Sequence, residues 1–164
     1  MSNSIVAQVP KNLLFRYRVN CQRYDGKFNS KFKLGPAYKL PHLGEFERQR
    51  TFVDFHVGWS PEGLFFDITI RDKTQSLWCR QNELLESDGI RIWIDTRDTH
   101  NVHRASKFCH WFVWLPTGGG PQSDSPVSTM LKINRSGEDS PTINRHPVDL
   151  SSKKTKDGYR CLLY

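Results

Sequence analysis

The stretch Gly89-Ile-Arg-Ile-Trp-Ile-Asp95 alternates apolar and polar side chains with a period of two residues. Successive side chains of an extended strand point to opposite faces, so the three isoleucines share one face while Arg91, Trp93 and Asp95 share the other. An inner face of β-branched residues and a mixed outer face predict a half-buried strand of an antiparallel sheet.

Two earlier runs, Phe52–Trp59 and Leu64–Arg71, show the same alternation. The sequence Ser60-Pro-Glu-Gly63 between them is typical of a tight turn, which predicts a hairpin of two antiparallel strands. Parity assigns to the core a set of alternating apolar residues: Val53, Phe55, Val57, Trp59, Phe66, Ile68 and Ile70.

The run Phe108-Cys-His-Trp-Phe-Val-Trp-Leu115 is apolar on both faces and stops at Pro116, and residues 117–126 are expected to form a flexible loop. Residues 20–50 are expected to hold mostly turns, and residues 1–12 to be flexible. Further strands are expected at Leu13–Val19, at Ser128–Asn134, and in a final hairpin around the turn Asp157-Gly158.

These elements predict an all-β fold, an antiparallel, jelly-roll-like β-sandwich formed by residues 1–164 as a single domain. The chain ends within its last expected strand. We therefore expect either that the final strands of the sandwich are missing or that a partner chain completes the sheet.

The composition favours one globular domain and argues against a membrane-spanning, an exported or a nucleic-acid-binding protein. No apolar run reaches the ~18 residues of a membrane span, and the N-terminus lacks a signal-peptide pattern, which favours a cytoplasmic location. The net charge of +7 comes from residues 1–50, which hold ten Lys and Arg against three Asp and Glu. No nucleic-acid-binding motif accompanies this charge, so no nucleic acid partner is expected.

The residue types that commonly bind metals are scattered along the sequence. Four cysteines without a CxxC pair, Cys21, Cys79, Cys109 and Cys161, are interpreted as free thiols. The histidines His100, His103 and His110 match no closed zinc pattern, so no metal site is expected. Asp95 and Asp98 are weak candidates for an oxygen-rich calcium site.

A resemblance to a known family covers residues 50–164. The pattern Trp59-Ser-x-x-Gly-Leu-Phe-Phe-Asp-Ile-Thr-Ile-Arg-Asp72, then Trp78, then Glu86-Ser-Asp-Gly-Ile-Arg-Ile-Trp-Ile-Asp95 resembles the family-nine carbohydrate-binding modules and the wider DOMON-like sandwich group, in particular a bacterial branch of it. The late Asp157-Gly-Tyr159 is similar to the strand entry of that group.

The resemblance implies a β-sandwich that binds the end of a glycan chain without catalysis of its own, often beside a glycoside hydrolase. Trp78 is similar to the first of two stacking tryptophans of the family, while the second belongs to a late segment that this chain lacks. Arg91 stands where the family has a sugar-binding glutamate, and His110 falls near a family arginine.

The residues themselves support a similar interpretation. Sugars present apolar C–H faces with hydroxyl rims, so an exposed indole offers a flat contact while polar side chains fix the orientation of the ring. The candidate ligand-binding residues are Trp78, Arg91, Trp93, His110 and Trp114. In the alternative interpretation, Trp93 and Trp114 face a second sheet or the 20–50 segment.

Two other functions remain open from the sequence. A haem-binding domain of the DOMON kind would need an axial pair such as Met130 with a strand histidine. A protein-interaction module would use the open edge at the end of the chain. An enzyme is not expected, because no nucleophile motif and no pair of facing carboxylates is evident.

Overall fold

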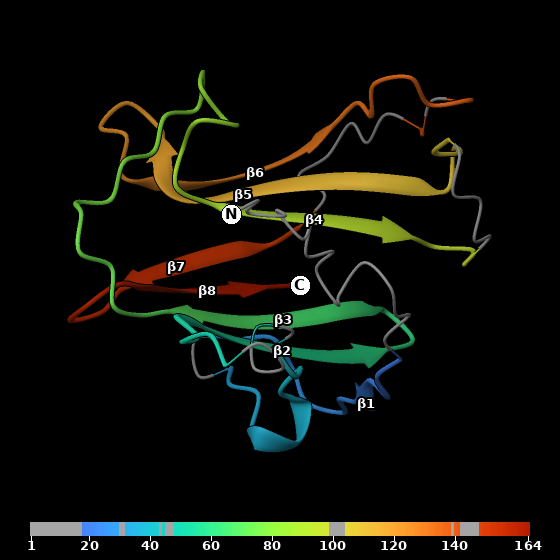
Figure 1. Ribbon diagram of the computed structural model, residues 1–164, viewed down its shortest axis with the longest axis horizontal. Coiled ribbons are helices and arrows are strands. Elements are labelled where there is room, and N and C mark those ends of the chain that lie inside the picture. Colours follow the sequence, from blue (N-terminus) through green and yellow to red (C-terminus); the bar gives the residue numbers. More distant parts are fainter. Residues whose placement is uncertain are drawn as a thin grey trace, which may run out of the picture.

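Two packed β-sheets make up the part of the chain that the computed structural model describes, which is residues 18–29, 32–42, 44, 48–98, 104–138, 140–141 and 148–164 (Figure 1). The larger sheet has the strand order β1-β2-β3-β8-β7, and the smaller sheet the order β4-β5-β6. The elements are β1 (Gln22–Arg23), the 3-10 turn η2 (Pro36–Tyr38), β2 (Val53–Ser60), β3 (Gly63–Ile70), β4 (Ile90–Asp95), β5 (Cys109–Gly119), β6 (Ser125–Leu131), β7 (Leu150–Lys154) and β8 (Tyr159–Leu163). The prediction of an all-β sandwich is confirmed.

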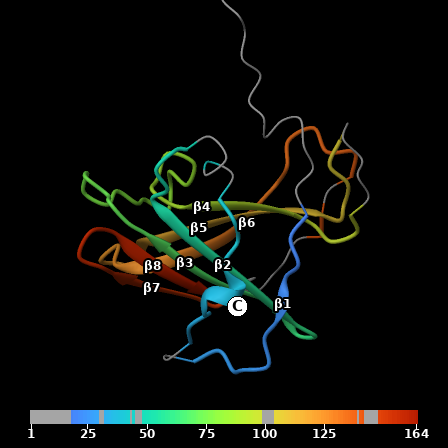
Figure 2. The ribbon, with the colours of Figure 1, turned by 60° about the horizontal axis from the view of Figure 1, so that its bottom comes forward.

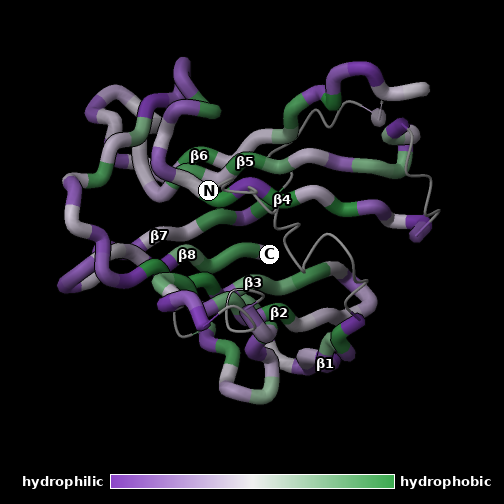
Figure 3. Tube along the Cα trace, in the orientation of Figure 1, coloured by the Kyte–Doolittle hydropathy of each residue, from purple (hydrophilic) through white to green (hydrophobic). Residues whose placement is uncertain are grey.

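The β2–β3 hairpin supplies the larger sheet with much of its inner face. Ser60 pairs with Gly63 across the predicted turn, and Phe55 pairs with Ile68 further along. Cross-strand partners share a face of the sheet. Most of the predicted core residues therefore lie inside, but Trp59 at the end of the hairpin is 40% exposed. Figure 3 shows the apolar stretches of β3 and β8 along the chain.

The two sheets meet where Trp114 of β5 packs against Phe66 of β3, with ring centroids 5.2 Å apart. Trp114 is 1% exposed, and Ile90 of β4 is its cross-strand partner. The three isoleucines of β4 face this core, as their alternation predicts, and Arg91 and Trp93 face outward.

Residues 24–29 and 32–38 lie against the outer face of the larger sheet (Figure 2). Phe32 and Leu34 are buried there against Phe65. Asp67 of β3, which is 3% exposed, accepts bonds of 2.7 and 2.6 Å from the Arg160 guanidinium and one of 3.0 Å from the Leu34 backbone N–H. A fully hydrogen-bonded buried carboxylate thus fastens this segment to the sheet.

The hairpin between β5 and β6 differs from the sequence prediction. Strand β5 continues through Pro116 to Gly119, and residues 125–126 already belong to β6, so the connection between the strands is residues 120–124, shorter than the predicted loop of residues 117–126. The register shifts between Leu115 and Gly119. A proline is tolerated at such an irregularity because the ladder does not need its missing N–H donor.

The end of the chain also differs from the prediction. The expected final hairpin is present as β7 and β8, but β8 lies between β3 and β7 and is hydrogen-bonded to both. The last strand is therefore an interior strand of the sheet, and the expected open edge for a partner chain is not found there. Of the expected strand Leu13–Val19, residues 13–17 lie outside the described residues, as do residues 1–12, and Arg18 and Val19 are not in a strand.

The turn into β8 requires a glycine. A Cβ atom added to Gly158 would overlap the carbonyl oxygen of Ile70, whereas one added to Gly35 would meet no atom within 4 Å. We expect Gly158→Ala to lower the free energy of unfolding by about 1–3 kcal/mol, because the backbone of two strands must shift. The matched control Gly35→Ala, at an extended position, should stay within about 0.5 kcal/mol of wild type. Urea unfolding of the two variants checks this, and equal stabilities would contradict the assigned packing.

Candidate functional site

The outer face of the smaller sheet carries the strongest candidate site. Trp93 pairs with Trp111 across β4 and β5, and Trp111 pairs with Leu131 on β6. Because paired residues share a face, these three side chains form one row. The row before it holds Arg91, and the row after it pairs Asp95 with Cys109.

Trp93 and Trp111 form a flat aromatic surface, here called the indole pair. Their ring centroids lie 5.2 Å apart and their planes differ by 15°, so the rings are stacked. Trp93 is 61% exposed, the largest exposure among the exposed large hydrophobic residues that the structure describes. A large indole left open on a rigid strand, and held there by a second indole, is a ready contact surface for a ligand.

Two predicted ligand-binding residues lie on the other side of the sheet. His110 pairs with Ile94 and Trp114 with Ile90, so both face the core. Placing them on the ligand face was wrong, because β5 is apolar on both faces and its sequence does not reveal which set is buried. Trp111 was missed for the same reason. The alternation of side chains along β5 that places His110 and Trp114 on the inner face places Trp111 on the outer face.

Trp78 lies on the loop before β4 and is 39% exposed. Its backbone N–H donates to the carboxylate of Asp88 at 2.8 Å, and the guanidinium of Arg80 lies 5.0 Å from the centroid of its indole ring. Trp93 lies on β4, where it stacks on Trp111 and not on Trp78. The loop and the sheet therefore present two separate tryptophans.

Arg91 shares the outer face with Trp93, as predicted, but its guanidinium is directed at the preceding loop. It donates to the backbone carbonyls of Leu85 and Ser87. The Ser87 side chain is buried and bonds both the N–H and the carbonyl of Arg80, which closes the loop on itself. Arg91 thus fixes the loop beside the indole pair, and its five donors leave capacity for a ligand.

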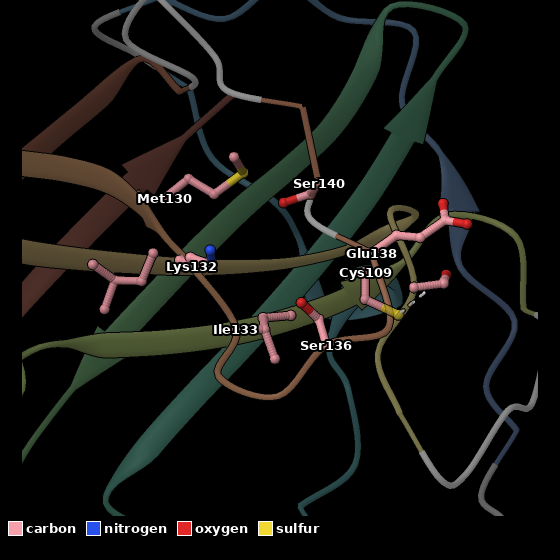
Figure 4. A pocket seen from close by; sticks show the side chains of 9 residues that line it. Cys109, Met130, Lys132, Ile133, Ser136, Glu138 and Ser140 are labelled. Atoms are coloured by element: carbon pink, nitrogen blue, oxygen red, sulfur yellow. Dashed lines mark hydrogen bonds between the residues drawn. The ribbon is translucent and has the colours of Figure 1, made fainter.

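A pocket of about 240 Å³ lies where β5 begins and β6 ends (Figure 4). Leu131, the partner of Trp111, and Cys109, two residues before Trp111, both line it. Its other lining residues come from the 106 turn and from the end of β6 onward: Ser106, Met130, Lys132, Ile133, Ser136, Glu138 and Ser140. A second pocket of about 360 Å³ shares Ser106 and Glu138 with the first, so the two are neighbours and are together called the groove.

The metal candidates among the described residues do not form a cluster. Within the described residues no three His, Cys, Asp or Glu side chains are grouped to hold a metal ion, and His100 and His103 lie outside those residues. The calcium candidate Asp95 accepts the Arg97 backbone N–H at 3.0 Å, and Asp98 has a φ of 48°. Met130 lines the pocket whereas His110 does not, and haem binding stays a prediction.

The four cysteines are free thiols, as predicted. Burial raises the pKa of Cys161 to about 12, and burial also raises the pKa of Cys79. Both groups are therefore protonated at neutral pH and are poor nucleophiles. Within the described part of the chain, no helix is long and apolar enough to cross a membrane.

No protein-family model, curated protein or solved structure matches this chain. The likeness to family-nine carbohydrate-binding modules therefore stays a prediction. The indole pair and the groove beside it are the features from which we infer a function.

Alanine substitutions of Trp93 and Trp114 should differ in their effect on the free energy of unfolding. We expect Trp114→Ala to lower the free energy of unfolding by about 3–5 kcal/mol, because it leaves a cavity where the sheets meet. Trp93→Ala removes only one stacked, exposed ring and should cost about 0.5–1.5 kcal/mol. Chemical denaturation measures both, and a greater loss for Trp93→Ala would reverse the assignment of faces.

Proposed function

We propose that the protein is a non-catalytic carbohydrate-binding module whose ligand surface is the indole pair. The observation that carries the proposal is the exposed Trp93 ring lying flat on Trp111 on the outer face of a rigid sheet. A pyranose ring has an apolar C–H face that matches such a surface, and stacking on an indole shields both from water.

Polar groups on both sides of Trp93 support the proposal. Arg91 precedes Trp93 by two residues on β4 and Asp95 follows it by two, so all three point to the same face at intervals of about 7 Å. Thr129 of β6 pairs with Val113 of β5, which places its hydroxyl in the row of Arg91. Donors and acceptors at this spacing can bind the hydroxyl rim of a sugar whose face covers Trp93.

The groove supports binding over catalysis. Hydrolysis of glycosides commonly uses two facing carboxyl groups. Among the described residues that line the two pockets, Glu138 is the only one with a carboxylate. That carboxylate also pairs with Lys107 at 3.2 Å, which suits a structural or ligand-contacting role better than proton transfer.

The test is a glycan array followed by titration of the best oligosaccharide by calorimetry. Trp93→Ala should weaken binding by at least about tenfold, because it removes the stacking surface. Trp59→Ala is the matched control: Trp59 is 40% exposed but belongs to the larger sheet, and its removal should leave affinity unchanged.

Two outcomes would contradict the proposal. Wild-type protein that binds no glycan on the array would exclude it. A loss of binding in Trp78→Ala, with Trp93→Ala unaffected, would move the site from the sheet to the loop before β4.

A further inference from the structure

We propose that the sugar bound here is acidic, with a carboxylate or sulfate group seated in the groove beside the indole pair. This inference rests on the proposed carbohydrate-binding function and names the class of ligand. It follows from the charges that line the groove and from the position of the groove next to Trp93 and Trp111.

The groove is rich in cations. Among the described residues, Arg104 and Lys107 line one of its pockets, Lys132 lines the other, and Glu138 is the one carboxylate in the lining. Arg97 adds a further positive charge, since its guanidinium lies 4.2 Å from the centroid of the Phe108 ring, which also lines the groove. A concave surface with an excess of positive charge concentrates its field and attracts anions.

The ion pair between Lys107 and Glu138 in this lining is open to exchange. The Lys107–Glu138 pair measures 3.2 Å, and the two side chains are 51% and 64% exposed. Exposed pairs of this kind contribute little stability. A ligand anion can therefore replace Glu138 as the partner of the Lys107 ammonium group without breaking a stable interaction of the fold.

The groove and the indole pair are close enough for one oligosaccharide to contact both. Cys109, in the pocket lining, and Trp111 are two residues apart on one face of β5, which separates them by about 7 Å. A ring stacked on Trp93 and Trp111 thus places the substituents of that ring or of its neighbour over the groove. Ser106 and Ser140 line the pocket there and place hydroxyl groups beside a bound anion.

The experiment compares ligands that differ only in charge. Calorimetry at low salt is run with oligogalacturonate against its fully methyl-esterified form, and with a sulfated galactan oligosaccharide against its desulfated form. In at least one pair the acidic member should bind about tenfold or more tightly, since hydrogen bonds to charged groups are the strong ones, and the preference should fall as salt is added. Which pair responds distinguishes carboxylate from sulfate.

Variants assign the preference to the groove. The double variant Lys107→Gln, Lys132→Gln should reduce the acid preference to less than about threefold and leave binding of the neutral member unchanged. Lys153→Gln, on β7 of the larger sheet, is the charge-matched control and should behave as wild type. Trp93→Ala should weaken both members of a pair by the same factor.

The failures of the two proposals can be told apart. Equal affinity for acidic and neutral members overturns this inference and leaves the carbohydrate-binding module standing, whereas no binding to any glycan overturns both. Equal affinity for single-stranded DNA of the same charge, with no effect of Trp93→Ala, would show a general polyanion surface and also overturns the inference.

Discussion

The contact between Trp114 and Phe66 is the constraint on which the arrangement of this protein depends. It joins the two sheets at their centre and buries the largest side chain in the core. Because side chains alternate along a strand, an inward Trp114 forces Phe112 and His110 inward and directs Val113, Trp111 and Cys109 to the outer face. The burial of Trp114 in the core therefore determines which aromatic residues of β5 are exposed to solvent.

The outer faces of the two sheets are covered differently, and this difference creates the candidate site. On the larger sheet the segment carrying Phe32 and Leu34 is tied down by the buried Asp67 carboxylate and leaves little of the central strands open. On the smaller sheet only the loop carrying Cys79 and Leu84 packs over the buried valines and leucine of β5 and β6. The rows of Trp93 and Cys109, beyond that loop, remain available to a ligand.

Strands with a clear two-residue period could be predicted from the sequence, together with the face each residue takes. In β2, β3 and β4 one set of alternate positions is apolar and the other is mixed, so burial follows from parity. In β5 both sets are apolar, and the choice depends on cross-strand register, which no local pattern encodes. His110 and Trp114 were misplaced and Trp111 missed for that reason. The groove could not be predicted from the sequence either, because it is formed by turns near residues 106 and 138, which are distant in sequence.

The interior position of β8 has a consequence for how the chain is made. Asp67 of β3 and Arg160 of β8 lie 93 residues apart, and all strands of the smaller sheet are encoded between them. Such non-local pairing is slow to form, because a long loop must close before the contact is gained. During synthesis the β2–β3 hairpin emerges first and exposes the free edge of β3 until β8 arrives. In that interval the nascent chain is most exposed to misassembly with other chains and has its greatest need of a chaperone.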